Sequence, residues 1–303
     1  MTGKSASLPL THLALAIAVA AVWGTNFVVI KVALAHLPPL LFAALRFTLA
    51  FLPAAFFVKR PAVPWSHLAA YGVLIGAGQF GILYIAMERN ISPGLASLVI
   101  QTQVFFTIGL AMWFSSEHVR LFQWIALVLA ASGLLIIALR GGSSATPVGL
   151  VLVLVAAFCW ACGNVIARGD APAPMLGYVV WASLFSFPPL FVLSLVFEGW
   201  PAIRSGLVGS DWLTWAAVLY QSVGNTLFGY ASWGWLLARH PAATISPIAL
   251  LVPVFGLATS ALVLGEPLPS WKLAATVLVM SGLALNIAWP RLRPLLGSMA
   301  GRA

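Results

Sequence analysis

The sequence predicts an all-α polytopic membrane protein with ten transmembrane helices arranged as two inverted five-helix repeats. Three observations carry this prediction. Hydrophobic residues make up 62% of the 303 residues and charged residues only 7%, too few to form the charged shell of a soluble domain. Apolar runs of about 20 residues, the length that crosses a bilayer, follow one another along almost the whole chain. A polar signature in the first run returns about halfway along the chain.

The breaks between the apolar runs fall at prolines, glycines and charged residues, which interrupt helices. In the first repeat, residues 11–139, we expect helices at 11–34, 39–58, 66–87, 93–115 and 121–139. In the second repeat, residues 148–289, we expect helices at 148–168, 174–197, 211–237, 242–264 and 270–289.

The first helix needs a separate argument, because Lys4 followed by an apolar run resembles a secretory signal. The run continues through Trp23 to Ile30, which is about long enough to span a bilayer. A similar segment around Trp160 is internal and cannot be a signal. We therefore expect the first helix to be retained.

The polar signature consists of a tryptophan, an asparagine and a cation in each half: Trp23, Asn26 and Lys31, then Trp160, Asn164 and Arg168. The tryptophans and the cations share an offset of 137 (160 minus 23), and the asparagines are one residue out. Farther along, Ser97 and Ser246, like Glu117 and Glu266, are 149 residues apart. We expect the twelve extra residues (149 minus 137) in a loop at 198–211. Since each half has five helices, the halves run in opposite directions, as in many secondary transporters.

The net charge of +9 comes from basic residues scattered singly between apolar runs, so we assign it to membrane orientation and expect no nucleic-acid partner. With an internal N-terminus, the inner ends hold nine basic residues and the outer ends hold five. The positive-inside rule therefore predicts that both termini face the cytoplasm.

Polar residues deep in the predicted helices indicate a cavity, because they are unfavourable in lipid unless they face water or each other. Trp23 and Asn26 are three residues apart and Trp160 and Asn164 four apart, so each pair shares a helical face. Helix–helix hydrogen bonding is the alternative for each of these residues. The candidate substrate-binding residues are Trp23, Asn26, Gln79, Tyr84, Ser97, Gln101, Trp160, Asn164, Asn225, Tyr230 and Ser246.

Residue spacing on the fourth helix and the prolines add two further expectations about the candidate site. Ser97 and Gln101 share a face of the fourth helix, whereas Gln103 points elsewhere. A proline at membrane depth frees a carbonyl and is tolerated beside a polar cavity. The candidate hinge or gating residues are Pro53, Pro189, Pro247 and Pro253.

Arg46 is the one strongly basic residue well inside a predicted helix, roughly 10 Å from its outer end. It could bind a substrate carboxylate through a bidentate contact. It could instead have a structural role, snorkelling or holding backbone carbonyls of a neighbouring helix. We favour the structural role, because a fixed deep cation would release a zwitterion slowly.

The acidic residues and histidines all fall near the ends of the predicted helices. Ion-coupled carriers commonly keep such a group inside the membrane, so we expect weak coupling or facilitated transport. No motif for ATP hydrolysis occurs, and no cluster at membrane depth would support catalysis, a metal or a cofactor. Cys159 and Cys162 lie within an apolar run and are expected to be packing residues.

Four stretches resemble the drug/metabolite transporter superfamily, of the type with two EamA domains: 22–32, 93–99, 160–164 and 250–257. The resemblance covers about 13–289 and is closest to bacterial exporters of cysteine, O-acetylserine and related amino acids. It implies ten helices, inverted halves, cytoplasmic termini and a central cavity lined by helices 1, 3, 4, 6, 8 and 9. One departure is Ser116 before Glu117, where relatives usually have glycine.

Together these features predict a secondary transporter in the bacterial inner membrane, not an enzyme. We expect it to export amino acids and related small metabolites from the cytoplasm by alternating access, with broad specificity. The alternative is efflux of drugs or other metabolites, such as nucleosides or cationic compounds, by the same fold. Cationic drugs would usually need a buried acidic partner, which the predicted helices lack. We expect a monomer whose partners are its small-molecule substrates and the lipid bilayer.

Overall fold

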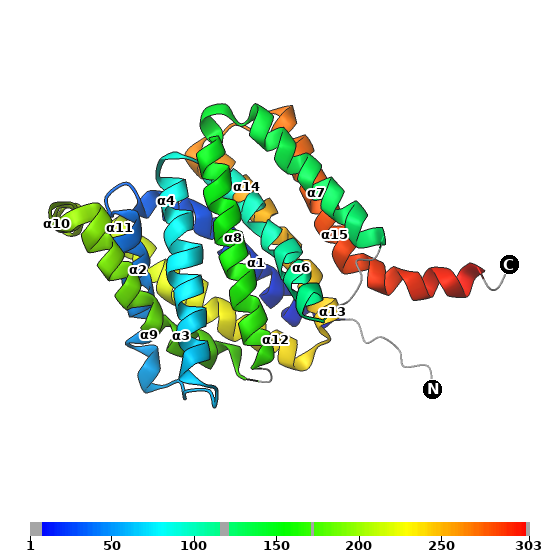
Figure 1. Ribbon diagram of the computed structural model, residues 1–303, viewed down its shortest axis with the longest axis horizontal. Helices are drawn as coiled ribbons and strands as arrows, with labels where there is room; N and C mark the ends of the chain where they lie inside the picture. The colour runs from blue at the N-terminus through cyan, green and yellow to red at the C-terminus, as the bar shows by residue number, and fades with distance from the viewer. Residues whose placement is uncertain (1–7, 116–120, 171–172, 301–303) are drawn as a thin grey trace.

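The computed structural model describes residues 8–115, 121–170 and 173–300. Within these ranges the chain is a helical bundle without named strands, and a single antiparallel bridge joins Ile91 to Ala145. The first half contains α1 (Leu10–Ala33), α2 (Pro39–Phe51), α3 (Trp65–Val73), α4 (Ile82–Arg89), α5 (Pro93–Val99), α6 (Gln103–Ser115) and α7 (Leu121–Arg140) (Figure 1). The second half contains α8 (Pro147–Gly169), α9 (Met175–Leu193), α10 (Gly199–Gly209), α11 (Trp212–Leu219), α12 (Gly229–Arg239), α13 (Ala242–Ile245), α14 (Leu251–Leu264) and α15 (Ser270–Ala300). Glu117, which the sequence pairs with Glu266, lies outside the described residues.

Nine helical segments of the described chain are long and apolar enough to cross a membrane: Leu10–Ala33, Pro39–Phe56, Trp65–Arg89, Pro93–Leu110, Leu121–Arg140, Pro147–Gly169, Met175–Gly209, Ser246–Leu264 and Ser270–Trp289. These correspond to nine of the ten expected helices. The remaining one is present as the continuous helical segment 212–239, formed by α11, a π-helical stretch and α12. Its middle, Tyr220–Phe228, is rich in polar residues, so it is more polar than the other nine.

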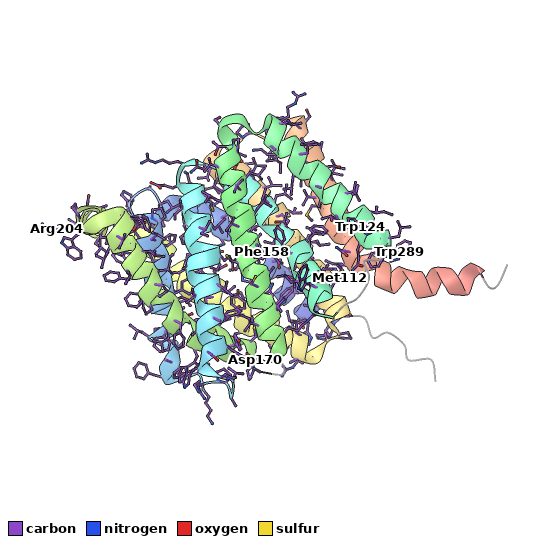
Figure 2. All side chains as sticks on the ribbon, in the orientation of Figure 1. Met112, Trp124, Phe158, Asp170, Arg204 and Trp289 are labelled. Atoms are coloured by element: carbon purple, nitrogen blue, oxygen red, sulfur yellow. The ribbon has the colours of Figure 1, made fainter. Side chains whose placement is uncertain are left out.

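Helices from the two halves interleave throughout the bundle. α1 packs on α14 and α6 on α8, while α2 packs on α9 and α7 on α15 (Figure 1). Exchanging the halves converts α1–α14 into α8–α6 and returns the other two pairs to themselves. This is the contact pattern of two related repeats packed around a common centre. α7 and α15 lie side by side at one lateral edge of the bundle (Figure 2). There the rings of Phe122 and Trp289 stack with centroids 6.0 Å apart.

The backbone departs from α-helix at matching places in the two halves. A π-helical stretch joins α3 to α4 at Leu74–Gly81, and another joins α11 to α12 at Tyr220–Phe228. A 3₁₀ turn lies between α5 and α6 at Ile100–Thr102, and another lies between α13 and α14 at Ser246–Leu250. Irregular backbone is tolerated at membrane depth only where it is buried in protein or lines a cavity, and π-helical turns are frequent at functional sites.

Glycines allow α1 and α14 to approach closely. A Cβ added at Gly24 would collide with Phe255 and with the backbone of Val252. Gly256 of α14, which also meets Gly24, packs directly against the Ser97 side chain of α5. Small residues of this kind are how membrane helices gain close van der Waals contact.

Three expected boundaries differ from the structure. The second helix ends at Phe51 and is followed by a 3₁₀ turn at Ala54–Phe56, because Pro53 cannot donate the hydrogen bond that would continue it. The expected loop at 198–211 contains α10, whose Ile203 and Gly206 are buried against the bundle. The last helix continues from the expected end at 289 to Ala300.

A candidate substrate cavity

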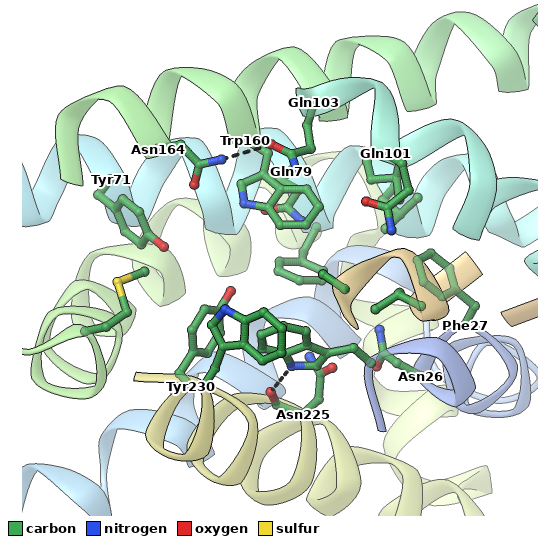
Figure 3. A pocket seen from close by; sticks show the side chains of 18 of the residues that line it. Asn26, Phe27, Tyr71, Gln79, Gln101, Gln103, Trp160, Asn164, Asn225 and Tyr230 are labelled. Carbon is green, nitrogen blue, oxygen red and sulfur yellow. Dashed lines mark hydrogen bonds between the residues drawn. The ribbon is translucent and has the colours of Figure 1, made fainter. Parts of the chain in front are cut away.

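A cavity of about 340 Å³ lies within the bundle, near the lower end of the roughly 300–1,000 Å³ range of small-molecule sites. All six helices that the family resemblance implied contribute to its lining, and α9 adds Met175. Eight of the eleven candidate residues line it: Trp23, Asn26, Gln79, Gln101, Trp160, Asn164, Asn225 and Tyr230 (Figure 3). Several of them lie on the π-helical and 3₁₀ stretches, so the irregular backbone coincides with the cavity.

Trp23 forms a wall of the cavity and joins α1 to α12. Its indole Nε1 donates a hydrogen bond to the backbone oxygen of Asn225 over 3.1 Å (Figure 3). The ring packs between Tyr230 and Trp233, with centroid distances of 5.7 and 5.2 Å, and lies directly against Gly229. Since its one donor is engaged, the indole offers the cavity an apolar face.

Asn26 and Gln79 line the cavity, and each has a buried acceptor without a partner in the described chain. Both side chains are 4% exposed, and their oxygens Oδ1 and Oε1 have no hydrogen-bond partner among the described residues. A buried acceptor without a partner costs about 1–3 kcal/mol. A ligand that carries several N–H donors would therefore gain by binding here, and an ammonium group has three.

Asn164 and Gln103 link α8 to α6 at the opposite wall (Figure 3). Asn164 Nδ2 donates to Gln103 Oε1 over 3.0 Å, and Thr107 Oγ1 donates to the same oxygen over 3.3 Å. Gln103 was expected to point elsewhere, yet it lines the cavity together with Gln101. The 3₁₀ turn at Ile100–Thr102 explains the difference, because it changes the angle between successive side chains.

Three candidate residues lie away from the cavity. Tyr84 is fully buried and accepts a hydrogen bond from Arg46, while Ser97 donates to the backbone oxygen of Gly94 over 2.7 Å. Ser246 begins the 3₁₀ turn of the ninth helix and is absent from the lining.

None of the four candidate prolines is a lining residue either. Pro189 lies inside α9 beside Pro188, and Pro253 lies in the first turn of α14. Pro247 is near the start of the 3₁₀ turn, and Pro53 follows the end of α2.

Arg46 lies immediately behind the cavity wall. It is 1% exposed, and its guanidinium donates to the hydroxyl oxygens of Tyr84 and Thr226, each over 2.9 Å. Its Cζ lies 3.8 Å from the centroid of the Phe80 ring and 4.9 Å from that of Phe47. Phe80 lines the cavity and Arg46 does not, so the phenyl ring separates the charge from the cavity.

The cavity reaches toward the end of the bundle where α1 begins. Its lining includes Met175, the first residue of α9, and Leu237, in the last turn of α12. His12 near the start of α1 lies at the same end, since its Nδ1 is 2.7 Å from Nε2 of His240, the residue after α12.

Charged side chains tie segments of the chain together at the opposite end of the bundle. The Glu266 carboxylate accepts hydrogen bonds from Lys272 over 2.7 Å and from the backbone N–H of Gly94 over 3.1 Å. Glu198 accepts from the first backbone N–H groups of α2, and Lys31 donates to the last carbonyls of α4. These contacts tie the starts of α2 and α5 and the end of α4 to other parts of the bundle.

Sequence reasoning missed several lining residues. Tyr71, Phe80 and Trp233 are the clearest cases. Trp233 follows Tyr230 by three residues, a spacing that places both on one helical face and could have indicated it. Phe80 is adjacent to Gln79, and neighbouring residues both reach the cavity because the π-helical stretch turns less per residue than an α-helix.

Comparison with known proteins agrees with this architecture. The model of the EamA-like transporter family matches residues 10–139 and 147–288. A "Probable amino-acid metabolite efflux pump" of Salmonella typhimurium is 43% identical over 285 residues, which cover 92% of this chain and 95% of that protein. A protein of the same name from Escherichia coli (strain K12) is 41% identical and covers 90% and 93%. One solved crystal structure shares the fold, with a TM-score of 0.62 at 18% identity, covering 91% of this chain and 96% of that one.

Proposed function

The chain belongs to the EamA-like transporter family, and on that premise we propose that it exports amino acids and related small metabolites across the bacterial inner membrane. The observation that carries the proposal is the membrane-embedded cavity, which neutral amides, indoles and phenols line from both halves. Relatives named as amino-acid metabolite efflux pumps, similar over nine-tenths of the chain, support the choice of substrate class.

The cavity suits a zwitterion of variable side chain. The free oxygens of Asn26 and Gln79 accept hydrogen bonds from the substrate's ammonium group. Trp23, Trp160 and Tyr230 provide broad apolar walls that accept different side chains. Because no lining side chain in the described chain is charged, affinity is modest and specificity broad.

Transport proceeds by alternating access. The inverted halves can exchange conformations, which changes the side on which the cavity opens. In this proposal the described state is the one closed where Glu198 and Glu266 bind the starts of α2 and α5. With both termini in the cytoplasm, as the distribution of basic residues favours, this closed end faces outward and the cavity faces inward. Pro189 and Pro253 are the proposed bending points in α9 and α14.

A single chain forms the transport unit in this proposal, since one copy supplies the whole lining. The lining residues include no acid, histidine or cysteine, so we assign them to binding and not to catalysis. For the same reason we propose transport that does not strictly require a proton gradient.

Efflux from cells loaded with a panel of amino acids tests the proposal. Cells that express the protein should lose at least one amino acid faster than cells that carry the empty vector. The matched control is the double variant Asn26→Leu/Gln79→Leu, which removes both free acceptors and should restore retention. Equal retention of every amino acid in the panel, with the protein present in the membrane, would refute the proposal.

A further inference from the structure

The guanidinium of Arg46 is a buried charge without an ionic partner. No acidic side chain of the described chain lies within ion-pair distance of it. Its contacts are two neutral hydroxyl groups and two phenyl rings, and its Nε has no hydrogen-bond partner. Such an uncompensated charge in a low-dielectric interior exerts a field over its surroundings.

The cavity begins close to this charge. Phe80 is one of its lining residues, and the centroid of the Phe80 ring lies 3.8 Å from Arg46 Cζ. A substrate atom in van der Waals contact with the other face of the ring, about 3.5–4 Å away, lies about 7.5 Å from Cζ. The Phe80 ring itself does not screen the charge, because a phenyl ring has no net charge and lies in the same dry interior.

A hydrogen-bond chain also connects Arg46 to the cavity wall. Arg46 donates to the hydroxyl of Tyr84, which donates to Gln221 Oε1 over 3.3 Å. Gln221 Nε2 in turn donates to the backbone oxygen of Asn26 over 3.5 Å. The chain anchors the guanidinium at a constant distance from the residues that line the cavity.

We propose that Arg46 sets the charge selectivity of the cavity, favouring substrates that carry a carboxylate and rejecting organic cations. This inference rests on the proposed function and specifies its substrate class. The carboxylate lies toward Phe80, and the ammonium group lies toward Asn26 and Gln79. At about 7.5 Å and an effective dielectric constant of about 20, the charge favours a carboxylate over a neutral group roughly 40-fold.

The test compares two ligands that differ only in this group: leucine, and leucine amide, in which a neutral amide replaces the carboxylate. Their inhibition of amino-acid counterflow is measured in proteoliposomes containing the full chain. The wild type should prefer leucine by roughly 40-fold. Arg46→Gln should reduce that preference to a few-fold, whereas Arg46→Lys, which keeps the charge, should retain most of it.

The matched control is Arg204→Gln, which removes a cation from α10 at the edge of the bundle (Figure 2) and should leave the preference unchanged. Phe80→Ala tests the proposal without altering the charge, and it should increase the preference because the ligand carboxylate can then approach Arg46 more closely.

The results distinguish the role of Arg46 from the export function itself. A wild type that prefers leucine no more than leucine amide, or an Arg46→Gln protein that loses affinity for both ligands equally, would overturn the role of Arg46. If no amino acid drives counterflow in the wild type at all, the proposed function itself fails.

Discussion

Replacing Lys272 by methionine is expected to destabilise the protein by about 3 kcal/mol. The Lys272 Nζ lies 2.7 Å from Glu266 Oε1, and the two side chains are only 1% and 9% exposed. Removing one partner of such a pair leaves a buried unpaired charge and costs about 3–5 kcal/mol. The lower value applies here because Ser92, Ser260 and the backbone N–H of Gly94 still donate to the carboxylate.

The assay is thermal unfolding of the purified protein in detergent. At about 2–4 °C per kcal/mol, the Lys272→Met variant should unfold about 6–12 °C below the wild type. The double variant Lys272→Met/Glu266→Gln should recover much of the loss, because it leaves no charge behind. Lys59→Met, at an exposed position, is the control and should change stability by less than about 0.5 kcal/mol.

The same pair predicts a pH dependence. Burial raises the pKa of Glu266, but hydrogen bonds from Lys272, Ser260 and Ser92 outweigh it and hold that pKa below its ordinary value of 4.5. The folded state therefore favours the ionised carboxylate. Its contribution to stability is complete above that ordinary value and is lost as the pH falls through the lower, folded pKa. A Lys272→Met protein that unfolds at the wild-type temperature at neutral pH would refute the reasoning.

Three further predictions concern the cavity. Asn26→Leu should reduce amino-acid efflux about tenfold, because a hydrogen bond to a charged group contributes about 1.5–3 kcal/mol; normal efflux would assign Asn26 to packing alone. Gln103→Leu and Asn164→Leu should each weaken efflux, and the double variant should be no worse than the stronger single one, since their 3.0 Å bond is shared; additive losses in efflux would contradict this coupling. Gly229→Val should displace the Trp23 indole, lower efflux and shift the tryptophan fluorescence, and an unchanged spectrum with normal efflux would show that the indole does not form the wall.

The helical bundle could be predicted from the sequence because the hydrocarbon core of a bilayer offers the backbone no hydrogen-bond partners. A spanning segment must be apolar and must satisfy its own backbone hydrogen bonds, so composition alone indicates most of the helices. The repeated residues Trp23 and Trp160 then indicated two related halves and a cavity between them. Both residues do line the cavity.

The sequence was less informative where neighbouring parts of the chain decide the backbone. The segment 198–211 looks like an inserted loop, yet it forms α10 because Ile203 and Gly206 find a surface on which to pack. Ser97 and Tyr84 were expected at the cavity, but they face α14 and Arg46 instead.

The sequence by itself therefore determined where the spanning helices lie along the chain and which polar residues are available to them. Only the tertiary structure decided which of those residues meet. Gln103 reaches the cavity because of a 3₁₀ turn, and Phe80 covers Arg46 because of a π-helical stretch. Such turns change the direction in which the following side chains point. Packing against helices more than a hundred residues away in the sequence stabilises these turns. Residue spacing within one helix carries no information about those distant partners.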